Sequence, residues 1–156
     1  AHVAHDCTLG NSVVLANGAS LAGHVEIHDH AILGGLVGVH QFCRIGRNAF
    51  LAGGAMVAQD VPPFCLVQGD RAQLMGINVV GLRRSGWSRE QLGALREAYR
   101  QLFLSDTVRL VALEKTEEEL APAWPDVAEL CKFIRSSRRG ICRPLSEPPS
   151  TDVYEG

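Results

Sequence analysis

The sequence predicts a parallel β-helix followed by a small helical region, and three observations lead to that fold. An aliphatic residue recurs at every sixth position over ten consecutive units, the pattern stops at a pair of prolines, and helical periodicity follows. A period of six is a multiple of the two-residue strand period and does not match the helical period of 3.6. Repeats of this length are typical of a parallel β-helix, in which each short strand stacks on its counterpart in the next coil.

The aliphatic positions define the core expected for this stem. They are Val3, Leu9, Leu15, Leu21, Ile27, Leu33, Val39, Ile45, Leu51 and Val57. We expect these side chains to point inward, and we expect small residues to fill the narrow space near the corners of each coil. Glycine and asparagine at the corners would supply backbone conformations that β-branched residues resist. These corner residues are Asn11, Asn17, Gly18, Gly23 and Gly35.

The form of the six-residue repeat resembles that of left-handed β-helix acyltransferases. Their triangular coils contain three such units, so residues 18 apart would stack at about the 4.8 Å spacing of neighbouring strands. We therefore assign residues 1–71 to a left-handed β-helix stem. The chain begins at Ala1 within the running pattern, and we expect further coils before it.

The pattern becomes helical beyond the prolines at positions 62 and 63, and we assign residues 72–143 to a small helical cap. Ser88 and Gln91 form a capping-box pair that precedes apolar residues at helical spacing. Further helices are expected around residues 107–121 and from Pro125 onward. Residues 144–156 are rich in proline and polar side chains, and we predict that they are disordered.

The composition is that of a soluble, folded protein, with 46% hydrophobic and 21% charged residues. No apolar run approaches the roughly 20 residues that a membrane-spanning helix needs. Five scattered cysteines without a CxxC pair predict reduced thiols, as in a cytosol. We therefore expect a cytoplasmic protein that has no integral membrane association and no nucleic-acid partner.

All six histidines lie between His2 and His40, which indicates a site on one part of the stem. On an 18-residue grid one corner collects five residues from three successive coils. They are His5, Asp6, Gly23, His24 and Gln41. Such a cluster could hold a general base, a carboxylate that orients it and a backbone donor, without any metal. We interpret His28 and His30, by contrast, as solvated corner residues.

Four segments make a family resemblance specific, and together they run from residue 1 to about residue 143. They are AHVAHDCTLGNSVVLANGASLAGHV, GGLVGVHQFCRIG, VAQDVPPF and GINVVGLRRSG. In these segments the chain resembles the carboxy-terminal part of UDP-N-acetylglucosamine O-acyltransferases. The resemblance implies transfer of an (R)-3-hydroxyacyl group from acyl carrier protein to the 3-hydroxyl of UDP-N-acetylglucosamine, the first step of lipid A biosynthesis. It also implies a homotrimer with sites between neighbouring stems, and no cofactor.

The resemblance also implies roles for individual residues. His5 would be the general base, Asp6 would orient its imidazole, and the backbone N–H of Gly23 would stabilise the oxyanion. Four polar side chains would bind substrate groups along the same cleft. They are His2, His24, His40 and Gln41.

Further implied roles concern the nucleotide and the acyl chain. Asn78 and Arg84 would contact the nucleotide, although Val80 and Ser85 depart from the family pattern beside them. Gly53 would leave the end of the acyl groove open, so we expect a long 3-hydroxyacyl group, nearer to about 14 carbons than to about 10.

Three alternatives to this function remain open from the sequence. The first is the N-acyltransferase of the same pathway, which acts on an amine. The second is a metalloenzyme of the γ-carbonic anhydrase type, which fits the number of histidines but explains neither the His5–Asp6 pair nor the helical cap. The third is a non-catalytic β-helix scaffold.

Overall fold

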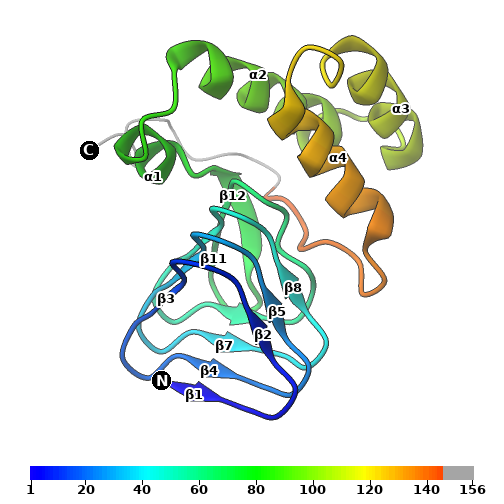
Figure 1. Ribbon diagram of the computed structural model, residues 1–156. Helices are drawn as coiled ribbons and strands as arrows, with labels where there is room; N and C mark the ends of the chain where they lie inside the picture. The colour runs from blue at the N-terminus through cyan, green and yellow to red at the C-terminus, as the bar shows by residue number, and fades with distance from the viewer. Residues whose placement is uncertain (146–156) are drawn as a thin grey trace.

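The computed structural model describes residues 1–145, and the amino-terminal part is built from ten strands of two residues each. The strands are β1 (His2–Val3), β2 (Thr8–Leu9), β3 (Val14–Leu15), β4 (Ser20–Leu21), β5 (Glu26–Ile27), β6 (Ile32–Leu33), β7 (Gly38–Val39), β8 (Arg44–Ile45), β9 (Phe50–Leu51) and β10 (Met56–Val57). Strands of successive coils pair in parallel, so that His2 pairs with Ser20 and Thr8 with Glu26. The predicted left-handed β-helix with triangular coils is confirmed (Figure 1).

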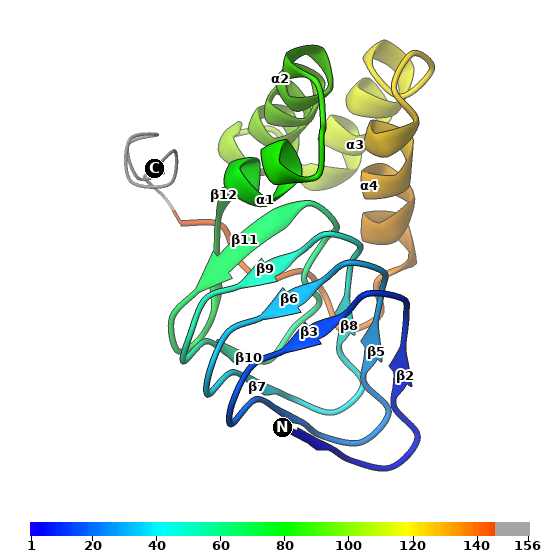
Figure 2. The same ribbon diagram turned by 60° about the vertical axis from the view of Figure 1, so that its left-hand side comes forward.

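The coils form three flat faces that meet at three corners (Figures 1 and 2). Face A consists of β1, β4, β7 and β10, and face B consists of β2, β5 and β8. Face C contains β3, β6 and β9, and it is extended by β11 (Cys65–Gln68) and β12 (Gln73–Ile77). We name the corners by the faces they join: corner AB holds residues 4–6, 22–24 and 40–42, corner BC holds 10–12, 28–30 and 46–48, and corner CA holds 16–18, 34–36 and 52–54.

The predicted core is confirmed in the middle of the stem but not in its first coil. Leu21, Leu33 and Leu51 are fully enclosed, whereas Val3 and Leu9 keep 42% and 41% of their surface exposed. Val3 stands in register with the buried Leu21, so its position in the coil is the expected one. It is exposed because a coil buries its neighbours' side chains only where another coil lies against it, and among the described residues only one coil packs against the first. The expectation that Val3 and Leu9 are inside was therefore wrong.

The third residue of every corner adopts a left-handed backbone conformation, and most of these residues are not glycine. Asp6, His24 and Phe42 at corner AB have φ values of 59°, 60° and 65°. Among the glycine and asparagine residues expected to do this, only Gly18 does, with φ of 75°. The parallel ladder holds these residues, since the His24 N–H donates to the His5 carbonyl oxygen at 3.1 Å and the Phe42 N–H to that of Gly23 at 3.1 Å. Such strain at a non-glycine residue persists only where the surrounding structure imposes it.

The stem ends where β11 continues face C in parallel with β9 and β12 returns antiparallel to β11. The first helix, α1 (Val79–Arg84), begins directly after β12, with Asn78 as its N-cap. Residues 73–77 thus belong to a strand of face C, although we assigned them to the helical region. At the other end the Leu145 N–H donates to the Leu74 carbonyl oxygen at 2.9 Å. The disorder predicted for residues 144–156 otherwise concerns residues 146–156, which lie outside the described part.

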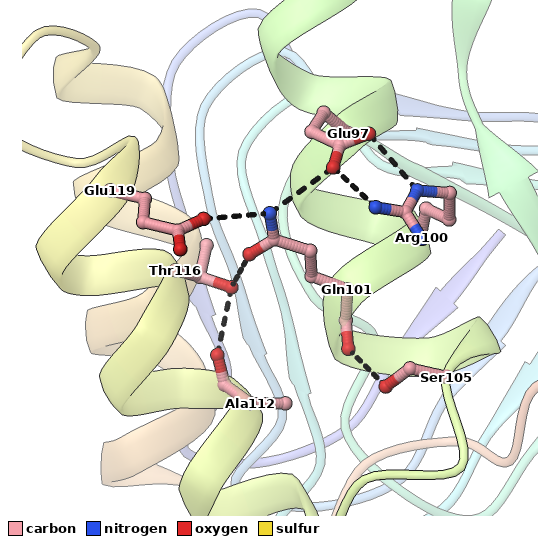
Figure 3. Close-up of polar contacts among 7 residues, drawn as sticks. All are labelled: Glu97, Arg100, Gln101, Ser105, Ala112, Thr116 and Glu119. Atoms are coloured by element: carbon pink, nitrogen blue, oxygen red, sulfur yellow. Dashed lines mark hydrogen bonds and ion pairs between the residues drawn. The ribbon is translucent and has the colours of Figure 1, made fainter.

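Four further helical segments follow α1. They are α2 (Arg89–Tyr99), the π-helix η1 (Arg100–Leu104), α3 (Arg109–Glu119) and α4 (Pro125–Ser136). The predicted capping box is present at the start of α2, where Ser88 and Gln91 exchange side-chain to backbone hydrogen bonds. Figure 3 shows how η1 is joined to α3: the buried Gln101 side chain accepts from the Thr116 hydroxyl at 2.9 Å and donates to Glu97 at 3.1 Å.

The helices lie along corner BC and not across the open end of the stem (Figures 1 and 2). Arg47 at this corner reaches Asp126 at 3.0 Å and Glu129 at 3.1 Å, both on α4. The Arg44 guanidinium lies 4.3 Å above the ring of Phe133 on the same helix. Corner BC is therefore covered, whereas corners AB and CA carry no helix in the described chain.

Candidate active site

Corner AB brings together the histidines and the carboxylate predicted to form the site. His5 Nδ1 lies 3.0 Å from Asp6 Oδ2, and His24 Nε2 lies 3.8 Å from the same oxygen. The two imidazole rings meet edge to face with centroids 5.2 Å apart. His5 and Asp6 expose 74% and 66% of their side chains, so a substrate can reach them without any rearrangement of this chain.

The Asp6 carboxyl is held in its charged form by the two histidines. Its hydrogen bond with His5, and after that the charge of His24, lower the pKa of Asp6 below its usual value. An ionised carboxylate on Nδ1 favours the imidazole tautomer whose Nε2 carries the free lone pair. In that tautomer Nε2 is able to accept a proton from a substrate.

Gly23 lies directly beneath the His5 ring, one coil further along the stem. A Cβ atom at position 23 would stand 2.8 Å from His5 Cε1 and 2.9 Å from His5 Nε2, so a side chain there would displace the His5 ring. Within residues 1–145 the Gly23 N–H makes no hydrogen bond. The corner therefore places an unused backbone donor next to the nitrogen that can act as a base, which is the arrangement that stabilises an oxyanion during acyl transfer.

Phe42 completes the corner and was not among the residues we predicted for the site. Its ring stacks on His24 with centroids 4.8 Å apart and an angle of 10° between the planes. The signal was available in the sequence, because Phe42 falls in the same column of the coil grid as Asp6 and His24. Gln41 is exposed beside it, and the backbone carbonyl of Gln41 lies 3.4 Å from His40 Nδ1.

A shallow groove of about 580 Å³ runs from corner AB over face A. His2 and His40 border it, and its floor consists of small residues such as Ser20 and Gly38. Met56 lies across this floor: a Cβ atom at Gly38 would stand 2.9 Å from the Met56 sulfur. Arg71 lines the groove as well. Met56 was not predicted as a site residue, since nothing in the hexad pattern marks an outward-facing position as part of a groove.

Asn78 and Arg84 line a second pocket of about 430 Å³, on face C beneath α1. The Asn78 amide is used within the fold, because its nitrogen donates to the Asn48 carbonyl oxygen at 3.0 Å and its oxygen caps Gly81 N–H at 3.2 Å. Arg84 makes no ion pair within residues 1–145. Val80 and Ser85, the two departures from the family pattern, line the same pocket. The structure thus separates these residues from His5 by placing them on a different face of the stem.

Gly53 lies at corner CA, and its backbone does not require a glycine. The left-handed conformation at this corner belongs to Gly54, with φ of 76°. A Cβ atom at Gly53 would stand 3.4 Å from its nearest neighbour, the Gly35 carbonyl oxygen. Position 53 can therefore carry a side chain, and it is exposed.

A left-handed β-helix with a His–Asp pair beside a free backbone donor defines the class of hexapeptide-repeat acyltransferases. Comparison with known proteins narrows this class. The family model for domain 2 of UDP-N-acetylglucosamine O-acyltransferases matches residues 60–142. The chain therefore belongs to the UDP-N-acetylglucosamine O-acyltransferase family.

Individual relatives agree with this assignment. The acyl-(acyl-carrier-protein)–UDP-N-acetylglucosamine O-acyltransferase of Alkalilimnicola ehrlichii is 53% identical over 142 residues, which cover 91% of this chain and 55% of the relative. The crystal structure of Arabidopsis UDP-N-acetylglucosamine acyltransferase superposes with a TM-score of 0.85 at 43% identity, covering 90% of this chain and 52% of that one. The enzyme of Moraxella catarrhalis superposes with a TM-score of 0.86 at 40% identity, covering 90% and 55%. The chain spans about half the length of the relatives it matches.

Among the described residues no helix is long and apolar enough to cross a membrane.

Proposed function

We propose that this chain supplies the catalytic corner of an enzyme that transfers an (R)-3-hydroxyacyl group from acyl carrier protein to the 3-hydroxyl of UDP-N-acetylglucosamine. The observation that carries the proposal is the His5–Asp6 pair at 3.0 Å beside the unused N–H of Gly23. Family membership supports this reaction over an N-acyltransferase and over a γ-carbonic anhydrase, because the relatives are named as O-acyltransferases. The exposed His5–Asp6 pair also supports catalysis over a passive scaffold.

The proposed reaction needs one base and one oxyanion donor. His5 Nε2 takes the proton from the sugar 3-hydroxyl while the oxygen attacks the thioester carbonyl carbon. The negative charge that forms on the carbonyl oxygen is stabilised by the Gly23 N–H, and Asp6 stabilises the imidazolium. The tetrahedral intermediate then expels the carrier thiolate, which takes the proton back from His5. The thioester is already activated, so no covalent enzyme intermediate is needed.

The remaining predicted residues divide between two faces, and this division supports a site shared between subunits. His2, His24, His40 and Gln41 surround corner AB and the groove on face A, where they can bind the sugar and the start of the acyl chain. Asn78 and Arg84 lie on face C. A single nucleotide sugar could contact both groups only if face C of a second stem lay against face A of the first. We therefore infer a homotrimer of the full-length protein, since cyclic symmetry brings unlike faces of neighbouring rods together.

We place the proposed reaction in the cytoplasm, at the first step of lipid A biosynthesis. Acyl carrier protein is the donor, and the transfer uses no metal or other cofactor. Four arginines lie between residues 135 and 143, where they could contact an acidic carrier. Two of them already make contacts within the fold. Arg135 binds Glu117 at 2.7 Å, and Arg139 donates to the Ala58 carbonyl oxygen at 2.9 Å. Arg138 and Arg143 make no ion pair within residues 1–145 and remain the better candidates.

The test is acyl transfer by the full-length protein from 3-hydroxyacyl carrier protein to UDP-N-acetylglucosamine, with wild type compared with His5→Ala and His30→Ala. His30 is a matched control, because it is an exposed histidine with φ of 62° at a corner that our mechanism does not use. We expect loss of transfer in the first variant only. Absence of transfer by the well-folded wild type, or equal rates in all three proteins, would refute the proposed function.

A further inference from the structure

Corner AB also has the donor set of a metal site. His5, Asp6 and His24 each offer a ligand atom, and these atoms all lie within 4.8 Å of one another. Within residues 1–145 this is the only group of three or more such side chains that lie this close together. Two imidazole nitrogens and one carboxylate oxygen are a ligand set that zinc accepts, with a fourth position left open.

Two of the three separations between the donor atoms lie close to those of tetrahedral coordination. With Zn–N and Zn–O bonds of about 2.0–2.2 Å, the edges of a tetrahedron measure roughly 3.3 Å. His5 Nδ1 and His24 Nε2 lie 3.0 Å and 3.8 Å from Asp6 Oδ2, one slightly below and one slightly above that edge. All three donor atoms lie within 4.8 Å of one another, and rotation of these exposed side chains would bring them onto one ion, with solvent as the fourth ligand.

The backbone holds the three residues in this arrangement before any ion arrives. Asp6 and His24 occupy successive corner positions with nearly the same φ, and the His24 N–H donates to the His5 carbonyl oxygen at 3.1 Å. Phe42 stacks on His24 and restricts its ring. Among the described residues no arginine or lysine pairs with the Asp6 carboxylate, so its oxygens stay available to a cation. A ligand set that is already positioned loses little conformational entropy on binding.

We propose that His5, Asp6 and His24 bind a zinc ion, and that this ion inhibits acyl transfer. The ion would bind His5 at Nδ1, the nitrogen that faces Asp6. A neutral imidazole that binds a metal through Nδ1 carries its one proton on Nε2. Nε2 then has no lone pair for the sugar hydroxyl, so the base is blocked without the ion touching the substrate. The binding stands on geometry alone, whereas the inhibition rests on the proposed function.

Binding is tested on the full-length protein after treatment with a chelator. Zn²⁺ is titrated by calorimetry, and Co²⁺ is titrated in parallel because its visible absorption reports tetrahedral coordination. We expect one zinc ion per chain in wild type and in His30→Ala. His24→Ala and Asp6→Asn should each weaken binding by at least the about 10–100-fold that loss of a supporting residue costs at zinc sites. Binding should also weaken at acid pH, since protons compete for the imidazoles.

The contrary outcomes are equally concrete. No binding up to millimolar zinc would overturn the site. The same affinity in wild type and in both ligand variants would show that zinc binds only adventitiously, and this result would overturn the site as well. Circular dichroism of each variant establishes that it is folded. If one of the two ligand variants does not fold, the other still tests the site.

Inhibition is measured separately on active wild-type enzyme. We expect zinc to reduce the rate with a midpoint equal to the calorimetric Kd, and a chelator to restore it fully. Full activity with the site saturated would overturn the inhibitory role. An enzyme that is inactive even without metal would count against the proposed function, while the calorimetric result for the site would be unaffected.

Discussion

Two corners of the same stem carry a histidine paired with an acid, and they differ in what covers them. At corner AB, His5 Nδ1 and Asp6 Oδ2 are 3.0 Å apart, and no helix of the described chain lies over them. Near corner BC, His28 Nε2 and Glu26 Oε1 are 2.7 Å apart, and the His28 ring meets Phe133 of α4 edge to face at 5.9 Å. Only 31% of the His28 side chain is exposed, against 74% for His5.

The difference teaches that a His–acid pair does not by itself define a catalytic site on a β-helix. Each pair lies at or beside a corner of a coil, and the position of the helices determines which pair is free for a substrate. Near corner BC the pair lies among contacts that fasten α4 to the stem, with Arg47 bound to Asp126 and Glu129. At corner AB nothing in the described chain uses the pair for the fold.

The largest expected effect is the difference between alanine variants of His5 and His28. His5→Ala should lower kcat by about 10²–10⁴-fold, the usual cost of removing a general base, with little change in melting temperature. His28→Ala should lower the melting temperature and leave kcat nearly unchanged, because it removes packing against Phe133 and a partner of Glu26. Steady-state rates and thermal unfolding of both variants check this. A large loss of kcat in His28→Ala with an unchanged melting temperature would contradict it.

Asp6→Ala should cost less activity than His5→Ala. The substitution removes the orientation of the imidazole and the charge that supports its protonated form, but it leaves the base itself. Binding of UDP-N-acetylglucosamine should be nearly unchanged in both variants, as measured by calorimetry. A rate for Asp6→Ala below that of His5→Ala would mean that the carboxylate, and not the imidazole, takes the proton.

Corner CA sharpens the comparison, because it is open but carries no histidine and no acid. If Gly53 measures the acyl chain, Gly53→Met should shift preference toward shorter donors. Four methylenes at about 0.8 kcal/mol each correspond to roughly two orders of magnitude in selectivity. Relative kcat/KM for donors of different length measures this, and the variant should fold because Gly53 does not adopt a left-handed conformation.

Met56→Gly is the matched variant for this experiment. Met56 lies across the floor of the groove on face A, over Gly38, and it could end the groove before Gly53 is reached. If Gly53 is the ruler, Met56→Gly should leave the preferred length unchanged. A shift toward longer donors in Met56→Gly, with none in Gly53→Met, would transfer the role to Met56.

The stem could be predicted from the sequence because its geometry repeats with every coil, so that local spacing determines which residues stack. That is why spacing, together with the 18-residue coil that the family resemblance implies, places His5, Asp6, Gly23 and His24 at one corner. The contacts of α4 could not be predicted in this way. They join distant parts of the chain, such as Arg47 and Glu129, and no period connects the two regions. For this reason our interpretation of His28 as a solvated residue was wrong.

Two other features depend on information that the sequence pattern does not contain. The exposure of Val3 depends on what lies before the first coil, and a repeat is the same whether or not it is covered. The π-helix at Arg100–Leu104 differs from the α-helix before it only by a shift of hydrogen-bond partners. Its buried Gln101 is held by Thr116 from α3, a partner that becomes evident only in three dimensions.

Arg47 offers a smaller effect on the covered corner. Arg47→Met should lower the free energy of unfolding by about 1.5–3 kcal/mol, the usual worth of hydrogen bonds to charged groups. The guanidinium also lies 5.0 Å from the Phe64 ring centre, which adds a packing contribution. Denaturant unfolding of the full-length protein measures the change, with Arg138→Met as a control expected to stay within about 0.5 kcal/mol. Equal stabilities of the two variants would show that α4 does not depend on this contact.

The smallest effect is a change in titration at the open corner. The Asp6 carboxyl should titrate below the usual value of about 3.9, because His5 and His24 favour its charged form. A folded-state pKa lower than the unfolded one stabilises the fold above the unfolded pKa, and this contribution is lost as pH falls through the folded pKa. Carbon-13 NMR of the side-chain carboxyl checks the direction. In His5→Ala the midpoint should move upward, and an unchanged midpoint would remove His5 as its main cause.

The register between coils makes the length of this stem adjustable in whole coils only. Removal of residues 26–43 would join Val25 to Arg44, which already occupies the equivalent place one coil later, since Glu26 pairs with Arg44. His5, Asp6, Gly23 and His24 would keep their neighbours, but Asp60 would then stand over His24 in place of Phe42. Removal of a single hexad from the same segment would instead move every later residue, Arg47 and α4 included, to a different corner relative to His5. A lineage of such proteins can therefore gain or lose coils while it keeps its catalytic corner, and each change of this kind alters what lies above His24.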